Sequence, residues 1–339
     1  MSQNVICQDA YAKNMLILNQ EEVKQIIPLS EIDKVVKQIE LAFSKYGKGE
    51  VDMPPKTYLY FKKDNGDLRV MPSFSEELKM AGTKIVNVHP DNPKQNLPTV
   101  GAVIVLNDAK TGAPLALMDG TYITGMRTGA AGAVASKYLA KEGAKSLGVV
   151  GAGQQAIFQI AATASALKLE DILVYDVNEA NIEKLATELE KIGIKIKKGT
   201  LEEVSKQDIL TTTTPSREPV VKNDWVVKGM HINAVGADAE GKEELDPEIL
   251  KRAKIILDDW TQASHSGEIN VPVAKGIIKK EDVYGSLGEV VAGIKKGREN
   301  NEEITMFDST GLALQDLFAA AMVYEEALKR GVGKDIKIF

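Results

Sequence analysis

Apolar and polar positions follow two different periods along this chain, and the clearest pattern lies near its middle. Leu147-Gly148-Val149-Val150 is a short apolar run that leads directly into Gly151-Ala152-Gly153-Gln154-Gln155-Ala156. A stretch with helical spacing follows, and a second apolar run, Ile172–Tyr175, ends at Asp176. Short apolar runs bounded by turn residues are typical of buried strands. The pattern therefore predicts a strand, a tight turn, a helix and a second strand.

Further strands are predicted in the same part of the chain. Their apolar runs are Ile209–Thr212, His231–Val235, Ile255–Asp258 and Ile304–Phe307. Asp246-Pro247 between them is a typical helix start, because Asp caps a helix and Pro suits the first helical position. Strands that alternate with helices predict an α/β arrangement.

The N-terminal part begins with two predicted helices. Asn19 is expected to cap the first, with Glu22 reaching back to it, and Ser30 is expected to cap the second. The second helix has apolar side chains at helical spacing up to Gly47, at Ile32, Val35, Val36, Ile39, Phe43 and Tyr46.

After residue 56 the period changes to that of strands. Turn residues separate these runs, which are Thr57–Phe61, Leu68–Met71, Thr83–Val88, Val100–Asn107 and Pro114–Leu117. Such closely spaced strands predict an antiparallel or mixed sheet.

Two helices border the predicted strand-rich and α/β parts. Residues 122–139 are dense in glycine and alanine, so we expect this helix to pack closely on its neighbours. Residues 311–329 are apolar at helical spacing and are expected to return to the first domain. The fold class is then α/β, with a Rossmann dinucleotide-binding domain at 126–311 and an α+β domain at 1–125 plus 312–339.

Composition narrows the function classes. Of the 339 residues 44% are hydrophobic and 27% charged, and the net charge of −6 comes without a basic stripe, which disfavours nucleic-acid binding. The polar start predicts no signal peptide and no apolar run predicts a membrane span, so we expect a cytoplasmic protein. Cys7 is the single cysteine, which excludes an intramolecular disulfide, and the three histidines (His89, His231 and His265) lack ligand spacing, so no metal site is expected.

The glycine-rich turn carries the first chemical prediction. Gly151 permits the tight turn, Gly153 lets the backbone approach a pyrophosphate, and the small Ala156 brings the helix close to the strand. Asp176 ends the second strand, where a carboxylate accepts from the ribose hydroxyls and repels a 2′-phosphate. We therefore predict NAD rather than NADP as the cofactor. The alternative is an ordinary turn with an incidental exposed aspartate.

Other candidates lie at strand and helix ends. Lys84 shares a strand face with Val86 and Val88, so it is either an edge residue that reaches solvent or a functional amine. Asp238 follows a strand and a glycine, where this fold carries ligands, although a solvated turn aspartate has the same sequence pattern. Arg127 begins the small-residue helix, and Lys56 and Arg69 have the alternative of being ordinary surface charges. The three histidines have no acid partner in the sequence pattern, which favours structural roles.

Together these residues resemble the ornithine cyclodeaminase/mu-crystallin family over nearly the whole chain, and its archaeal-type alanine dehydrogenase branch most. The shared motifs include Met53-Pro54-Pro55-Lys56, Arg69-Val70-Met71-Pro72, residues 84–90, Leu97-Pro98-Thr99, Met118-Asp119-Gly120, Arg127-Thr128, Gly151-Ala152-Gly153, residues 231–238 and 241–246, Leu287-Gly288-Glu289, and Ser309 with Gly311 and Asp316.

The resemblance implies a role for each of these residues. Lys84 and Asp238 would be the catalytic pair, and the substrate would be bound by Lys56, Arg69, Thr99 and Arg127. Neighbouring cations would lower the pKa of Lys84 and make it usable as an acid and a base. NAD would be bound by Arg127, Thr128, Gly151, Gly153, Gln154, Gln155, Asp176, Val177, Asn178, Thr213, Thr214, Ser216, Val235, Gly236, Ala237 and Ser309.

The implied reaction is NAD-dependent interconversion of L-alanine with pyruvate and ammonia by a homodimer. The resemblance also implies that residues 1–125 plus 312–339 form the substrate-binding and dimerisation domain. An ornithine cyclodeaminase and a ketimine reductase remain alternatives, as does a non-enzymatic binding protein. Arg69 replaces an acid that, by resemblance, holds the distal amine of ornithine in cyclodeaminases. A second ammonium would meet like charge there, which favours alanine as the substrate.

Overall fold

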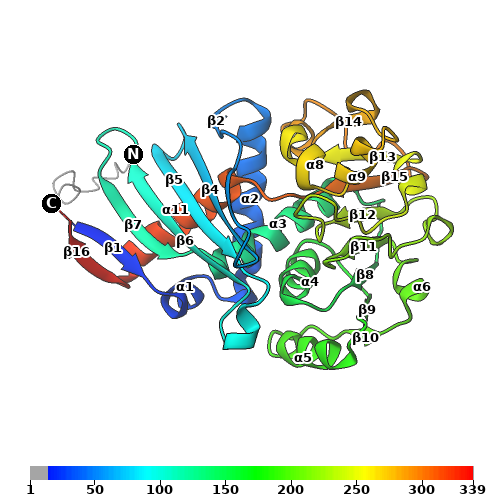
Figure 1. The fold of residues 1–339 in the computed structure, drawn as a ribbon, viewed down its shortest axis with the longest axis horizontal. Helices are drawn as coiled ribbons and strands as arrows, with labels where there is room; N and C mark the ends of the chain where they lie inside the picture. The colour runs from blue at the N-terminus through cyan, green and yellow to red at the C-terminus, as the bar shows by residue number, and fades with distance from the viewer. Residues whose placement is uncertain (1–13, 339) are drawn as a thin grey trace. The chain divides into compact units, whose positions relative to one another are not determined.

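The computed structural model of this protein describes residues 14–338 (Figure 1). The chain forms two compact units, of which unit 1 comprises residues 14–28, 50–124 and 316–338 and unit 2 comprises 29–49 and 125–315. The sequence-based division instead places residues 29–49 with the first domain, and as a division by function it stays a prediction. Cys7 lies outside the described residues.

Unit 1 is built on a mixed eight-stranded sheet in the order β16-β1-β7-β6-β5-β4-β2, with β3 also paired to β4. Only the β1–β7 pair in this sheet is parallel. Its strands are β1 (Asn14–Leu18), β2 (Val51–Asp52), β3 (Thr57–Phe61), β4 (Gly66–Ser75), β5 (Met80–Val88), β6 (Val100–Asp108), β7 (Pro114–Asp119) and β16 (Lys334–Lys337). The prediction of an antiparallel or mixed sheet is confirmed.

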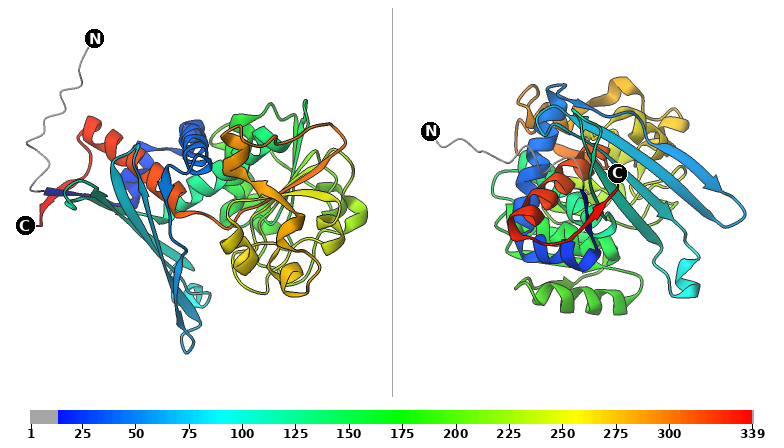
Figure 2. Two further views of the ribbon diagram at one scale, coloured as in Figure 1. Left: turned by 90° about the horizontal axis from the view of Figure 1, so that it is seen from above. Right: turned by 90° about the vertical axis from the view of Figure 1, so that its left-hand side faces the viewer.

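The two faces of this sheet differ in burial. Helix α11 (Ala313–Arg330) lies along one face (Figure 2), and Lys84 on β5 bonds to Asp316 of this helix. Met71 and Ile104 stand opposite Lys84 on the neighbouring strands and are buried with it. The opposite face also carries apolar side chains, but these are only half-buried or exposed: Leu59, Leu68, Val70, Ile85, Val103, Val105 and Leu117.

Two predicted helix starts have different outcomes. Helix α1 (Gln20–Ile26) begins with the expected reciprocal bonds between Asn19 and Glu22. Helix α2 (Ile32–Gly47) ends at Gly47 as predicted, but Ser30 does not cap it. A 3-10 turn, η1 (Leu29–Glu31), precedes α2 and makes Glu31 the residue at its N-terminus. The prediction for Ser30 is therefore wrong.

Unit 2 contains an all-parallel eight-stranded sheet in the order β10-β9-β8-β11-β12-β15-β13-β14. The strands are β8 (Ser146–Val150), β9 (Asp171–Tyr175), β10 (Lys197–Lys198), β11 (Ile209–Thr212), β12 (His231–Ala234), β13 (Ala253–Leu257), β14 (Val283–Ser286) and β15 (Ile304–Asp308). The strand order reverses between β8 and β11, which is the Rossmann arrangement and the place where such sheets bind ligands. The predicted α/β fold is confirmed.

Short connections and helices join these strands. The remaining elements are α3 (Thr121–Leu139), α4 (Gln154–Ala166), α5 (Glu179–Glu190), α6 (Leu201–Val204), α7 (Pro247–Leu250), α8 (Trp260–Ser266), α9 (Asn270–Ala274), α10 (Leu287–Val291) and the 3-10 turns η2 (Asn92–Gln95), η3 (Asn223–Trp225) and η4 (Lys280–Asp282). Asp246 caps α7 with Pro247 at its start, as predicted. His265 lies in α8.

The small residues of α3 allow close packing against α4. A Cβ atom on Gly129 would lie 2.3 Å from the Phe158 carbonyl oxygen, and one on Gly132 would lie 2.2 Å from Gln159 Oε1. Gln159 also donates from Nε2 to the Thr128 carbonyl oxygen at 3.0 Å. The expected close packing of this helix is confirmed, because a larger side chain at either glycine would force the helices apart.

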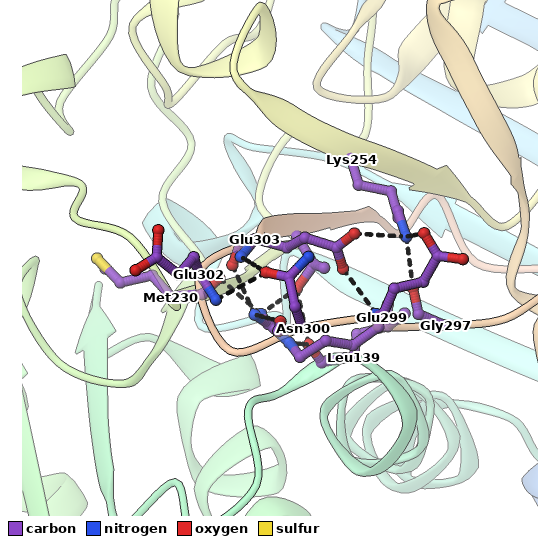
Figure 3. A network of polar contacts seen from close by, with 10 residues as sticks. Leu139, Met230, Lys254, Gly297, Glu299, Asn300, Glu302 and Glu303 are labelled. Atoms are coloured by element: carbon purple, nitrogen blue, oxygen red, sulfur yellow. Dashed lines mark hydrogen bonds and ion pairs between the residues drawn. The ribbon is translucent and has the colours of Figure 1, made fainter.

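A polar network fixes the end of the parallel sheet at which the strands start (Figure 3). Arg298 donates to the carbonyl oxygens of Leu139, Met230, Asn300 and Glu303 at 2.6–3.3 Å. Lys254 in β13 lies 3.0 Å from Glu303 Oε1 and 3.7 Å from Glu299 Oε2. These bonds join the starts of β12, β13 and β15 and so fix the positions of these three strands relative to one another.

The buried side chain of His231 adds further contacts to this polar network. The His231 ring nitrogens lie 3.0 Å from Thr305 Oγ1 and 3.0 Å from Asn233 Oδ1. Burial lowers the pKa of His231 to about 3, so the ring is neutral and structural, as the sequence suggested.

Two kinds of feature are absent from residues 14–338. None of their helices is long and apolar enough to span a membrane. No group of three or more His, Cys, Asp and Glu side chains in this range is arranged to hold a metal ion.

Candidate active site

The glycine-rich turn follows β8 in unit 2. Gly151 has a φ of +99°, a conformation that favours glycine, and α4 begins directly after Gly153. A Cβ atom on Gly153 would meet no atom within 4 Å, so open space lies beside this residue. The first turn of a helix presents backbone N–H groups and a positive dipole end. This geometry suits a pyrophosphate, as the sequence predicted.

Asp176 follows β9 and contacts the same turn. Its carboxylate accepts from the Ala152 N–H at 2.7 Å, the Asn178 N–H at 2.8 Å and Asn181 Nδ2 at 3.2 Å. The acid therefore also fixes the glycine-rich turn, a role that the sequence did not indicate. Val177 beside it is 91% exposed and places no cation next to Asp176.

Two polar atoms near these elements support a bound group. Gln155 Oε1 and Ser309 Oγ are buried, and neither has a hydrogen-bond partner within residues 14–338. Gln155 lies in the first turn of α4, and Ser309 follows β15. Buried polar atoms of this kind are normally satisfied by a ligand or water. With the glycine-rich turn and Asp176, these residues fit a dinucleotide.

The loops after β11 and β12 contribute further predicted residues. Thr213 Oγ1 donates to the Gly151 carbonyl oxygen at 2.9 Å, which ties the loop after β11 to the glycine-rich turn. Ser216 Oγ donates to the Glu218 carbonyl oxygen and forms a local turn. The N–H groups of Thr214 and Gly236 both donate to the Glu244 carboxylate.

The same carboxyl-terminal edge of the sheet includes Val235, Ala237 and Ser309. Val235 and Ala237 flank Gly236 after β12, and both are buried. The Ser309 N–H donates to the Ala234 carbonyl oxygen at 3.0 Å. The structure thus brings most of the predicted cofactor residues to one edge of the unit 2 sheet.

Asp238 lies two residues beyond Gly236. Its Oδ1 atom is 2.5 Å from Lys242 Nζ, and its side chain is 43% exposed. The Asp238 carboxylate is therefore accessible and paired with a cation. Lys242 was missed by the sequence reasoning, although it lies four residues from Asp238.

Arg127 lies on α3 and is buried within unit 2. Its Nη1 atom donates to Gln315 Oε1 at 2.8 Å. A Cβ atom on Gly311 would lie 2.5 Å from this Nη1 atom, so the guanidinium rests against a glycine where no side chain fits. Thr128, the neighbouring predicted cofactor residue, is also buried.

The catalytic candidate of unit 1 is Lys84. Its ammonium lies 2.7–2.8 Å from both carboxylate oxygens of Asp316 and 3.3 Å from Thr124 Oγ1. Thr124 Oγ1 in turn donates to the Gly120 carbonyl oxygen at 2.6 Å. Lys84 is therefore paired with a carboxylate of α11, whereas the sequence argument assumed neighbouring cations.

Arg69 and Asp67 form a second pair in unit 1. Arg69 Nε lies 2.8 Å from Asp67 Oδ1, and Nη2 lies 3.1 Å from Oδ2. The guanidinium also lies 5.5 Å from the centre of the Tyr58 ring. Because Asp67 balances its charge, Arg69 repels a second ammonium less strongly than the sequence argument assumed.

The other two predicted substrate residues of unit 1 lie at strand ends. Lys56 immediately precedes β3 and is half-buried. Thr99 precedes β6, and its carbonyl oxygen accepts from the His89 N–H at 2.8 Å, which extends the pairing of β5 with β6. The roles of both side chains in substrate binding stay predictions.

Buried acids beneath the loops of unit 2 were missed as a group. Glu244, Glu268, Asp258 and Asp308 are each at most 1% exposed. Burial, and then the Glu244 charge, raise the pKa of Glu268 well above its usual range. Burial, and then the Asp258 charge, raise the pKa of Asp308 to about 8. Acids in a polar stretch such as residues 242–246 normally indicate a solvated loop, so the pattern gave no signal of burial.

Comparison with known proteins agrees with this geometry. Residues 13–331 match the model of the ornithine cyclodeaminase/mu-crystallin family. An alanine dehydrogenase of Archaeoglobus fulgidus is 52% identical over 324 residues, which cover 96% of this chain and 98% of that protein.

Two solved structures extend the comparison. An archaeal alanine dehydrogenase dimer with bound NAD has a TM-score of 0.92 and 51% identity, covering 96% of this chain and 100% of its own. A Delta(1)-pyrroline-2-carboxylate reductase of Thermococcus litoralis, in complex with NADH and L-proline, has a TM-score of 0.90 and 43% identity, covering 95% and 100%. The chain belongs to the ornithine cyclodeaminase/mu-crystallin family.

Proposed function

We propose that this protein is an NAD-dependent alanine dehydrogenase, which converts L-alanine and water to pyruvate and ammonia and also runs in reverse. The identity of 52% to an alanine dehydrogenase over nearly the whole of both chains carries this proposal. The glycine-rich turn, Asp176 and the two unsatisfied buried oxygens support a dinucleotide as the cofactor.

NAD is favoured over NADP for an electrostatic reason. A 2′-phosphate on the adenosine ribose would bring negative charge towards Asp176, and the exposed Val177 offers no compensating cation. Bound NAD supplies the acceptor for the hydride that leaves the α-carbon of alanine. The protein contributes binding, orientation and proton transfer.

The substrate carboxylate needs directional cationic donors. Arg69 is suited to this role because Asp67 and Tyr58 fix the orientation of its guanidinium. We assign Lys56, Arg127 and Thr99 to the same substrate. Held in this way, alanine presents its α-carbon in one orientation.

Proton transfer is assigned to Lys84 and Asp238. Once the amino acid has been oxidised to the imine, Asp238 accepts a proton from water as the water oxygen bonds to the imine carbon. In the same step Lys84 donates a proton to the imine nitrogen, which gives a carbinolamine. The carbon–nitrogen bond then breaks as Asp238 passes its proton to the nitrogen and ammonia leaves, and the neutral Lys84 amine takes the proton of the hydroxyl group that becomes the pyruvate carbonyl. In reductive amination each proton moves in the opposite direction.

A cyclic-imine reductase is the second candidate, favoured by the similarity to the Thermococcus litoralis reductase. A screen that follows NADH absorbance distinguishes the two. An alanine dehydrogenase forms NADH from L-alanine and NAD, and consumes NADH with pyruvate and ammonia. Consumption of NADH with a cyclic imine, without any reaction of alanine or of pyruvate with ammonia, would replace the proposal by the reductase. Release of ammonia from ornithine without net NADH would indicate a cyclodeaminase.

We also propose a homodimer formed through the uncovered face of the unit 1 sheet. Val70 stands opposite Ile85, Ile85 opposite Val103, and Val103 is 42% exposed. A continuous apolar face of this kind indicates an interface. Light scattering of the native protein should give twice the monomer mass. The variant Val103→Glu should give the monomer mass, because a charge would then lie in the interface. A monomeric native protein would contradict the proposal.

A further inference from the structure

The Glu244 carboxylate joins two loops at the carboxyl-terminal edge of the unit 2 sheet. It accepts from the Thr214 N–H at 2.6 Å and from the Gly236 N–H at 2.9 Å. Thr212 Oγ1, at the end of β11, donates to it at 2.7 Å. Thr214 belongs to the loop after β11 and Gly236 to the loop after β12, so one buried side chain fixes both loops.

The contact is close enough to exclude any side chain at position 236. A Cβ atom on Gly236 would lie 2.3 Å from the Thr214 carbonyl oxygen and 2.7 Å from Glu244 Cδ. Gly236 therefore lets the two loops approach each other around the carboxylate, and its place in the sequence is explained by this approach.

The backbone around Glu244 is fixed as firmly as its side chain. The N–H groups of Glu244 and Leu245 donate to the Glu268 carboxylate at 2.7–3.1 Å. The Glu244 carbonyl oxygen accepts from the N–H groups of Val220 and Val221 at 2.8 and 3.0 Å. The carboxylate is thus presented to the two loops by an ordered segment.

Neutral donors offset only part of the cost of burying the Glu244 carboxyl, because burial raises its pKa above the usual range. Within residues 14–338 no Lys, Arg or His side chain forms an ion pair with Glu244. Its hydrogen-bond partners are two backbone N–H groups and one hydroxyl. A carboxylate held only by such groups depends on each of them, because every lost donor leaves a buried charge less compensated.

We propose that Glu244 is a positioning residue, which sets the two loops for cofactor binding and for the placement of Asp238. Asp238 lies two residues after Gly236, and Thr213 lies between the two threonines that contact Glu244. The loops at this edge are where the Rossmann arrangement binds its ligand. The part that concerns Asp238 rests on the proposed function, whereas the part that concerns the dinucleotide does not.

Glu244→Gln is the main test, because it keeps the size of the side chain and replaces one acceptor by a donor. The amide NH₂ group would then face a backbone N–H of Thr214 or Gly236. We expect the dissociation constant for NADH, measured by NADH fluorescence, to rise on the order of tenfold, and kcat for alanine to fall by a similar factor. Glu243→Gln is the matched control, because Glu243 is the neighbouring buried acid but pairs with Lys275. This variant should keep the native NADH dissociation constant and the native kcat.

Thr212→Val is the second variant and removes only the hydroxyl donor. It should fold normally and raise the NADH dissociation constant severalfold. The melting temperature of each variant without cofactor is measured in parallel. A lower melting temperature with native NADH binding and native kcat would show a merely structural role and overturn the proposal. If Glu244→Gln does not fold, Thr212→Val decides by the same criterion.

The two proposals can fail separately. If the native protein forms no NADH from alanine, the proposed function fails, but NADH binding by the variants still tests the loops. Native NADH binding by both Glu244→Gln and Thr212→Val would reject the positioning role whatever the substrate is.

Discussion

Lys84 and Asp316 form a buried ion pair in which the ammonium nitrogen lies 2.7 Å from a carboxylate oxygen and the side chains are 1% and 2% exposed. The two residues are 232 positions apart in the sequence. Buried pairs of this kind are costly to break but add little stability over an apolar pair. Stabilisation alone therefore gives no reason for this pair, whose lysine we propose to be catalytic.

The first prediction separates these two effects. Lys84→Met should abolish turnover and lower the free energy of unfolding by about 3–5 kcal/mol, because it removes the ammonium from beside a buried carboxylate. Lys84→Met with Asp316→Leu should recover most of the stability and none of the activity. Urea denaturation and the alanine assay measure the two quantities. Activity in the double variant would remove Lys84 from the mechanism.

Asp238→Asn should keep the fold and NADH binding but lower kcat by about a hundredfold or more, because an amide cannot accept the proton from water. Lys242→Met is the control. It removes the cation beside Asp238 but leaves the carboxylate, so we expect at most a modest loss of activity from this partly exposed pair. Steady-state kinetics and NADH fluorescence provide the comparison, and full activity of Asp238→Asn would exclude Asp238 as the base.

Cofactor preference should follow Asp176. Asp176→Ser combined with Val177→Arg is expected to shift the ratio of kcat/KM values towards NADP, since a repelling carboxylate is replaced and a cation is added at an exposed position. Affinity for NAD should also fall, because Asp176 binds the Ala152 N–H of the glycine-rich turn. Val177→Arg alone is the control for the added charge. Equal use of both cofactors by the native protein would contradict the argument.

Asp308 should make stability depend on pH. Burial, and then the Asp258 charge, raise the pKa of Asp308 from 3.8 to about 8 in the folded protein. Between these values the folded state binds more protons than the unfolded state, so the Asp308 contribution to the free energy of unfolding falls as the pH rises from about 4 to about 8. Asp308→Asn should flatten this slope in urea denaturation. The exposed Asp335→Asn should not, and an equal slope in all three proteins would exclude Asp308 as its source.

Ornithine should be a poor substrate. Arg69 offers a cation to the distal ammonium of ornithine, but the pairing with Asp67 reduces the repulsion, so discrimination also depends on pocket size. Asp67→Asn should raise KM for alanine more than it lowers kcat, because Arg69 loses its fixed orientation. Product analysis with ornithine and alanine tests the first statement. Proline from ornithine with no NADH from alanine would reject the assignment.

Local patterns explain how much the sequence predicted. The strand Ile209–Thr212 agrees with β11 in both limits, and the glycine-rich turn with its helix and acid was placed correctly, because neighbouring residues determine these features. The position of β15 between β12 and β13 was not predicted, since it depends on contacts between distant segments. Strand Lys197–Lys198 is two exposed lysines and has no apolar signal.

The residues of the candidate site were also only partly predictable from the sequence. Lys84 was identified as a candidate from its apolar strand face, but its partner Asp316 lies on a helix near the other end of the chain. Glu244 stands in the polar sequence Lys242-Glu243-Glu244, which is typical of solvated loops, yet it is wholly buried. Its burial depends on contacts with Thr214 and Gly236 in the folded chain. The spacing of residues in the sequence does not predict these contacts.

The interrupted layout of unit 1 determines when it can form during synthesis. Strand β1 pairs with β16, and α11 carries the partner of Lys84, so unit 1 needs residues that follow unit 2 in the chain. Unit 2 ends at residue 315, so its sequence is available before β16 has been made. Since domains fold as their residues emerge, the Rossmann part is expected to form on the ribosome before β1 can pair with β16.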